Sequence, residues 1–106
     1  MIERNETIGR CIMQINAGQF TQACTDLTAI LEKEPQCYQA LVARGTCRAL
    51  AGSTVPAELK KADADFSKAI SIMPLLSDVY KRRSQARAAL GNLDGAITDL
   101  EECLSQ

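Results

Sequence analysis

Five cysteines have the widest chemical range in this chain, because a thiolate can act as a nucleophile or bind a metal ion. No two of them form a C-x-x-C motif, and the chain contains no histidine. A zinc site would need four thiolates from scattered positions, and a cysteine nucleophile would lack a histidine base. We therefore expect reduced thiols used as small apolar residues, with no metal and no cofactor. The five are Cys11, Cys24, Cys37, Cys47 and Cys103.

Other catalytic patterns are absent from the sequence. There is no glycine-rich phosphate loop and no G-x-S-x-G motif. The carboxylates are dispersed, and pairs such as Glu32/Glu34 and Glu101/Glu102 are typical of solvated helix faces. The sequence predicts a protein that is not an enzyme and has no catalytic residue.

Composition limits the class of protein further. The chain has 106 residues, of which 46% are hydrophobic and 24% charged, which fits one soluble domain. The formal net charge of −1 argues against nucleic acid as the main partner. No apolar run approaches the roughly 18 residues of a membrane helix, and no signal-peptide pattern is present. We expect a cytoplasmic protein without a membrane partner.

An internal repeat is the strongest signal in the sequence. Three glycines recur at spacings of 34 and 39 residues, namely Gly18, Gly52 and Gly91. Three alanines open apolar helical stripes at spacings of 39 and 34 residues, namely Ala23, Ala62 and Ala96. One insertion of five residues between Gly52 and Ala62, near 53–57, explains both offsets. The units then cover residues 4–37, 38–76 and 77–106.

This period, with glycine mid-repeat, alanine later and Pro35 or Pro74 near the end, resembles the tetratricopeptide repeat. The resemblance covers nearly the whole chain. It implies a single all-α domain over residues 1–106, a right-handed α-solenoid of three helix–turn–helix repeats with six antiparallel helices. The first helix of each repeat should span about 4–17, 37–51 and 76–90.

Residues at the expected helix ends agree with this interpretation. Gly18, Gly52 and Gly91 lie just past the first helices, where a left-handed cap favours glycine. Pro56 suits a first helical turn, and Asn92 can cap the last helix.

One arginine on every first helix and one aspartate on every second helix predict repeated structural ion pairs, within or between units. The Arg44-Gly45 step and Asp65 resemble an Arg-Gly/Asp subset of the tetratricopeptide family. The alternative is a basic stripe for an acidic peptide, made by Arg44/Arg48 and Arg83/Arg87. We favour the structural role. The paired positions are Arg10, Arg44 and Arg83 with Asp26, Asp65 and Asp99.

In tetratricopeptide proteins the first helices line a concave groove that holds a partner's peptide or helix. The resemblance places the following residues in this groove: Asn5, Ile8, Ile12, Ile15, Gln39, Val42, Thr46, Leu50, Lys81, Arg82 and Gln85. Such a groove is apolar over two units and basic at the third, which suits a peptide with apolar and acidic residues. Ile8, Ile12 and Ile15 have two further interpretations, as core or as a homo-oligomer contact.

Two narrower resemblances bear on the partner. Chaperone-binding members grip a carboxylate tail with lysine, asparagine and arginine, and of the matching positions only Arg82 fits, which argues against binding of the Hsp70 or Hsp90 tail. Residues 81–91 resemble a helix of plant and algal tetratricopeptide regulators of immunity.

Three functions remain open from the sequence. They are a scaffold that binds a protein partner, a self-associating structural module, and a fragment of a longer repeat array. The third unit lacks a polar capping helix, so Ile97, Leu100 and Leu104 could meet a neighbour.

Overall fold

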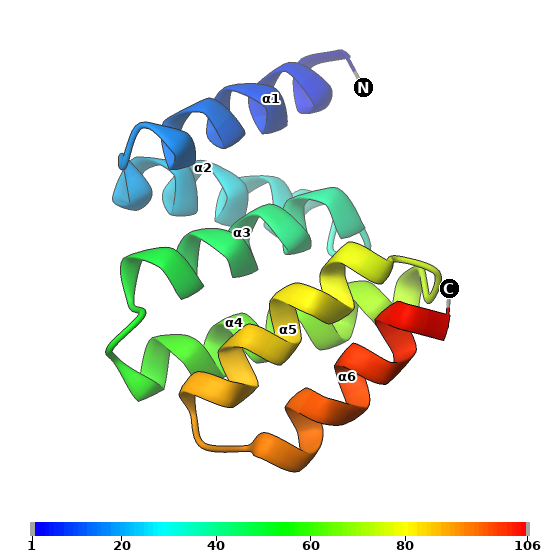
Figure 1. Cartoon of the computed structure of the whole chain (residues 1–106). Helices are drawn as coiled ribbons and strands as arrows, with labels where there is room; N and C mark the ends of the chain where they lie inside the picture. Colours follow the sequence, from blue (N-terminus) through cyan, green and yellow to red (C-terminus); the bar gives the residue numbers. More distant parts are fainter. Residues whose placement is uncertain (1, 106) are drawn as a thin grey trace.

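The computed structural model describes residues 2–105, and the side chains of residues 6–105. Six helices and no strand are found in this part of the chain, which confirms the expected all-α fold. They form three helix–turn–helix pairs, stacked one after another (Figure 1). The helices are α1 (Ile2–Asn16), α2 (Phe20–Lys33), α3 (Tyr38–Ala51), α4 (Pro56–Ile72), α5 (Ser77–Ala89) and α6 (Leu93–Ser105).

The stack is built by contacts between consecutive helices and between the first helices of successive pairs. α2 packs against α1 and α3, and α4 packs against α3 and α5. The first helices of successive pairs also touch, α1 against α3 and α3 against α5. This pattern is expected of repeats that cannot bury their apolar faces alone. None of the described helices has the length and apolar character needed to cross a membrane.

Gly18 and Gly91 end α1 and α5 in the expected left-handed conformation, with φ of 82° and 86°. After Gly18, the backbone N–H of Gln19 donates to the carbonyl of Gln14 at 2.8 Å. After Gly91, the N–H of Asn92 donates to the carbonyl of Arg87 at 2.8 Å. Both bonds close a Schellman motif, which satisfies the last carbonyls of the helix.

The expectation of a left-handed cap is wrong for Gly52, whose φ is −114°. Glycine is needed there for space instead. A Cβ at position 52 would lie 2.3 Å from Cβ of Glu58, in the first turn of α4. The chain between α3 and α4 folds back too closely to leave room for a side chain.

The pair α3–α4 holds the extra residues of the second unit. α4 begins four residues after Gly52, whereas α2 and α6 begin two residues after Gly18 and Gly91. α4 also has 17 residues against 14 in α2 and 13 in α6. Pro56 occupies the first turn of α4, as expected, and its fixed φ favours that position. The additional residues therefore lengthen both the loop and the start of α4.

The core follows the apolar stripes of the second helices. Leu27 and Phe66 are 0% and 1% exposed, and both face residues of the first helices. Gly45 on α3 makes room for the ring of Phe66, because a Cβ there would lie 2.7 Å from its Cε1. The Gly of the Arg-Gly step is therefore explained by packing.

Candidate functional site

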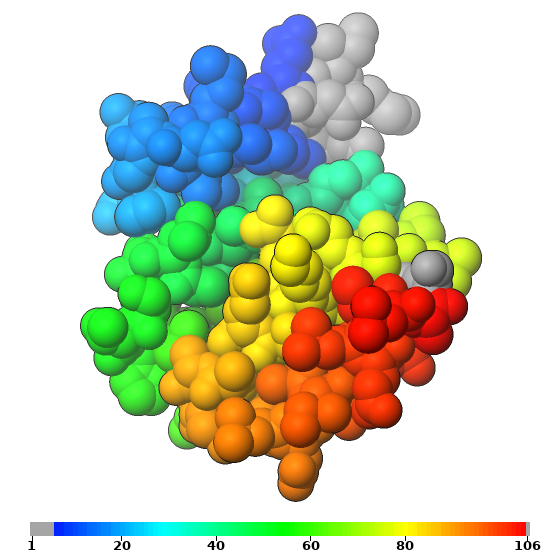
Figure 2. Space-filling view, viewed as in Figure 1, coloured from blue at the N-terminus to red at the C-terminus, as the bar shows by residue number. Residues whose placement is uncertain are grey.

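The three first helices enclose a hollow of about 470 Å³ on one face of the molecule. Figure 2 shows the surface stepping inward over α3, between the blue side chains of α1 and the yellow side chains of α5. Its walls are mainly apolar. The lining residues are Ile8, Ile12, Ile15, Asn16, Tyr38, Gln39, Val42, Ala43, Thr46, Leu50, Leu76, Asp78, Val79 and Arg82.

Most of the expected groove residues meet in this hollow. Those that line it are Ile8, Ile12, Ile15, Gln39, Val42, Thr46, Leu50 and Arg82. Gln85 lines a smaller neighbouring hollow instead, and Lys81 is exposed outside both. The side chain of Asn5 lies outside the described residues. Tyr38 and Leu76 were missed, because they precede the positions that the family pattern assigns to the groove.

Of the three isoleucines of α1, two agree with the interpretation as core. Ile8 and Ile15 are only 8% and 5% exposed and belong to the main core. α1 packs against both α2 and α3, so side chains at the edges of its apolar stripe are covered from two sides. Ile12 is 47% exposed and is the isoleucine that a ligand could reach.

Arg82 supplies the positive charge of the hollow. Its Nε donates to Oδ2 of Asp78 at 2.8 Å, one helical turn earlier on α5. The two side chains are 41% and 71% exposed, so water screens this pair. Nη1 also donates to the hydroxyl of Thr46 on α3 at 3.5 Å. Arg82 therefore reaches across from α5 to α3, with its side chain 41% exposed.

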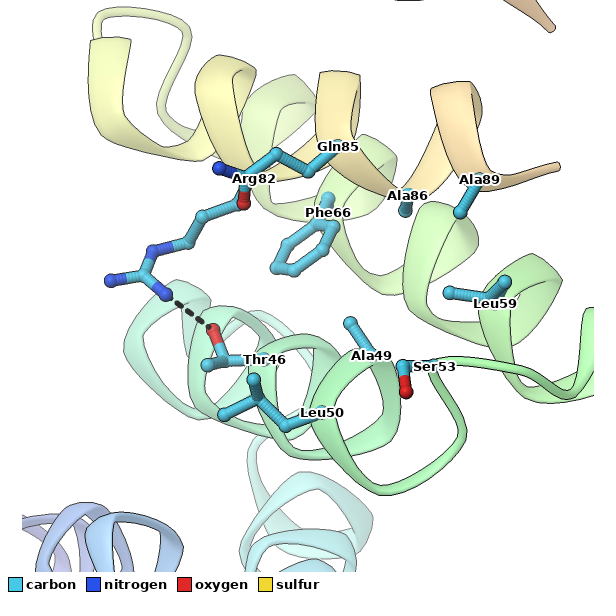
Figure 3. Close-up of a pocket in the computed structure, with 10 residues that line it drawn as sticks. All are labelled: Thr46, Ala49, Leu50, Ser53, Leu59, Phe66, Arg82, Gln85, Ala86 and Ala89. Carbon is cyan, nitrogen blue, oxygen red and sulfur yellow. Dashed lines mark hydrogen bonds between the residues drawn. The ribbon is translucent and has the colours of Figure 1, made fainter. Parts of the chain in front are cut away.

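A smaller hollow of about 190 Å³ continues the groove between α3 and α5. In Figure 3, Phe66 from α4 lies between these helices, with Arg82 and Thr46 joined at one side. Thr46, Leu50 and Arg82 line both hollows. The groove is thus continuous along the first helices, and α3 contributes to all of it.

Ion pairs on the other side of the first helices repeat in the second and third pairs. Arg44 donates two hydrogen bonds to the carboxylate of Asp65, from Nε at 3.0 Å and from Nη2 at 2.8 Å. Arg83 forms the same bidentate pair with Asp99, at 3.0 and 2.6 Å. The hydrogen bond to Asp65 raises the pKa of the Arg44 guanidinium above its ordinary value. Both pairs close within one helical pair, which the sequence left undecided.

A second arginine, one turn further along α3 and α5, binds the same carboxylate. Nη1 of Arg48 lies 2.9 Å from Oδ2 of Asp65. Nη1 of Arg87 lies 3.2 Å from Oδ2 of Asp99, and its Nε also contacts Asp63 at 3.3 Å. All four arginines of the suggested basic stripe therefore form ion pairs with aspartates. This geometry favours the structural role over capture of an acidic peptide on that side.

Arg44 and Arg83 also bind a hydroxyl of the preceding helical pair. Nη1 of Arg44 donates to Thr28 at 3.3 Å, and Nη1 of Arg83 donates to Ser67 at 3.0 Å. Sequence reasoning missed these two acceptors. Both follow the repeated aspartate of their own helix by two residues, and that spacing was the available signal.

The first pair has a longer and more exposed ion pair. Arg10 approaches Asp26 only to 3.9 Å and is 63% exposed. One sequence difference accompanies it: Gln14 stands where the other pairs have a second arginine. The buried Oε1 of Gln14 has no hydrogen-bond partner in the described part of the chain.

The five thiols are all free, and three of them, Cys11, Cys37 and Cys47, are buried. Burial is the main cause that raises the pKa of Cys47 to about 11, and its Sγ donates to the carbonyl of Phe20 at 3.0 Å. Burial also raises the pKa of Cys11. Both groups are protonated at neutral pH, a state that suits packing rather than nucleophilic attack. Within the described residues, no cluster of three or more potential ligands could hold a metal ion.

The fold and this surface together define a helical-repeat protein with an open, mainly apolar groove over its first helices. Its sequence is 23% identical over 100 residues to tetratricopeptide repeat protein 13 of Homo sapiens, matching 94% of this chain and 12% of that protein. It is 38% identical over 48 residues to tetratricopeptide repeat protein 36 of Danio rerio, which matches 45% of this chain and 26% of that protein. The chain thus spans a small part of both relatives. No family model matches it.

Proposed function

We propose that this chain is a tetratricopeptide module that binds a segment of a partner protein in the hollow over α1, α3 and α5, without catalysis. The observation that carries the proposal is the combination of an open apolar hollow with one accessible guanidinium at its edge. Two relatives named as tetratricopeptide repeat proteins support the family, and Arg44-Gly45 with Asp65 supports the Arg-Gly/Asp subset.

The exposed side chains of the hollow indicate what kind of segment would bind. Ile12 and Leu50 are 47% and 54% exposed, and burying such side chains against a ligand is favourable in proportion to the apolar area covered. Arg82 could exchange the solvent-exposed Asp78 for a ligand carboxylate, which it can bind through two parallel N–H groups. A segment with leucine-like residues next to acidic residues satisfies both features.

Binding of short labelled peptides, measured by fluorescence polarisation, tests this proposal. One set combines leucines with glutamates, and a matched set replaces the glutamates with lysines. We expect the acidic set to bind more tightly, and Arg82→Glu to weaken its binding by about tenfold, equivalent to about 1.4 kcal/mol. Leu50→Lys should weaken both sets, because it places a charge in the apolar wall.

Lys60→Glu is the matched control for Arg82→Glu. It makes the same reversal of charge at an exposed position of α4, away from the hollow. The proposal is wrong if the two peptide sets bind equally, or if Lys60→Glu weakens binding of the acidic set as much as Arg82→Glu does.

A further inference from the structure

The smaller hollow, between α3 and α5, reaches further into the fold than the main hollow does. The described residues that line the main hollow belong to α1, α3 and α5, apart from Leu76 just before α5. The smaller hollow also touches Leu59 and Phe66 of the second helix α4. Its volume of about 190 Å³ is many times the roughly 15 Å³ that holds one water molecule. It is therefore a recess in the floor of the groove, of a size to admit a side chain.

The junction between α1 and α3 shows how the same place is closed one repeat earlier. Ile15 of α1 and Cys47 of α3 are only 5% and 1% exposed there, and both belong to the main core. The second helix beneath them, α2, contributes no residue to the lining of the main hollow. The first junction is thus filled by the protein's own side chains.

Three alanines account for the recess at the second junction. When the repeats are aligned on their arginines, each alanine stands where the first junction has a larger residue. Ala49 corresponds to Ile15, Ala86 to Cys47 and Ala89 to Leu50. The second helices do not account for it, because each contributes one phenylalanine and one leucine, namely Phe20 and Leu27 in α2, and Leu59 and Phe66 in α4. The three alanines together lack about seven heavy atoms, roughly the size of one aromatic ring.

The longer side chains of this junction border the recess and do not fill it. Leu50 is 54% exposed, the side chain of Arg82 is 41% exposed, and Gln85 is also exposed. Figure 3 shows the space that remains between the alanines of α3 and those of α5, with Phe66 at one side and Leu59 at the other. The recess thus has apolar walls and a partly polar rim.

The chemistry of these walls favours an aromatic ring over an aliphatic side chain. Phe66 offers the ring a partner for offset or edge-to-face packing. The guanidinium of Arg82, at the rim, is attracted to the face of an aromatic ring. A leucine in the recess would cover the same apolar walls without gaining either contact.

We propose that this recess is a specificity pocket, which receives one aromatic side chain of the segment that binds in the groove. The inference rests on the proposed function and narrows its partner to segments that combine an acidic residue with a phenylalanine or tyrosine. Arg82 lines both hollows, so the aromatic residue is close in sequence to the carboxylate that Arg82 binds.

A positional scan of the leucine–glutamate peptides tests this pocket. One series carries phenylalanine at each position in turn, and two matched series carry leucine or alanine at the same position. We expect one position at which phenylalanine binds at least tenfold more tightly than alanine and several-fold more tightly than leucine, measured by fluorescence polarisation. At that position, the bound ring should also shift the NMR signals of the methyl groups of Ala49 and Ala86, which line the pocket.

Ala89→Leu gives the second junction the residue that the first junction has at this position. The larger side chain should occupy the pocket and remove the preference for phenylalanine, while the alanine peptide binds as before. Ala89 is exposed, so the protein is expected to remain folded. Ala88→Leu is the matched control, because it makes the same change at an exposed neighbouring position that lines neither hollow. It should keep the preference for phenylalanine.

Failure of the pocket and failure of the groove have different signatures. The pocket is overturned, and the groove retained, if the acidic peptides bind but no position prefers phenylalanine over leucine. It is likewise overturned if Ala89→Leu keeps the preference as fully as Ala88→Leu does. If no peptide of any series binds at millimolar concentration, the proposed function itself is wrong and the pocket falls with it.

Discussion

The ring of Phe66 lies where a side chain at position 45 would otherwise be. In the first pair the position of Gly45 holds Cys11, which is larger, and the position of Phe66 holds Leu27, which is smaller. The volumes on the two helices therefore compensate each other within a pair, as close packing of protein interiors requires. The sequence shows both residues of each pair, but only the structure shows that they meet.

Gly45→Ala tests this compensation. Alanine favours a helix by about 1 kcal/mol over glycine, yet its Cβ would lie 2.7 Å from the buried ring. We expect overpacking to exceed the gain in helix propensity, with a net loss of about 1–3 kcal/mol of unfolding free energy in urea denaturation.

Gly9→Ala is the matched control, because nothing lies within 4 Å of a Cβ at that helical position. It should stabilise the protein by up to about 1 kcal/mol. Combining Gly45→Ala with Phe66→Leu recreates the relation seen between Cys11 and Leu27, and should cost less than the sum of the two single changes. Strict additivity would mean that the two positions do not share one packing volume.

At the scale of the helices, local chemistry predicted several ends correctly. Asn92 accepts the backbone N–H of Gly95 at 3.1 Å, as a cap of α6, and Pro56 begins α4. The role of Gly52 could not be assigned from sequence. A glycine can be required for positive φ or for close approach of another segment, and the sequence does not distinguish the two. The sequence left the burial of Ile8 and Ile15 undecided for a related reason. A helical stripe does not show how many neighbours cover its edges.

The pair of Arg83 and Asp99 is expected to hold α6 in place. Asp99 is 1% exposed and α6 buries only one other residue, Ala96. Asp99→Leu leaves the charges of Arg83 and Arg87 without this carboxylate, and we expect a loss of about 3–5 kcal/mol in urea denaturation. Arg83→Met combined with Asp99→Leu should recover much of that loss, since Arg87 keeps its contact with Asp63.

Arg10→Met serves as the reference for an exposed member of the same repeated pair. Its 3.9 Å contact with Asp26 should contribute less than about 1 kcal/mol. If the double variant in the third pair is no more stable than Asp99→Leu alone, the cost does not arise from unpaired charge.

For the whole molecule, the order of contacts predicts an order of stability. In a stack of this kind, a helix held by one interface opens more easily than a helix held between two neighbours. α4 buries six residues between two first helices, whereas α6 buries two and contacts α5 alone. With one neighbouring helix instead of two, α6 should open more easily than α4.

Hydrogen exchange of backbone amides measures this difference directly. Under native conditions we expect amides of α6 to exchange at least tenfold faster than those of α3 and α4, because opening α6 requires the loss of one interface, whereas α3 and α4 each have two or more. Equal free energies of opening in α4 and α6 would contradict the prediction, since the stack would then unfold as a single cooperative unit in spite of its uneven contacts.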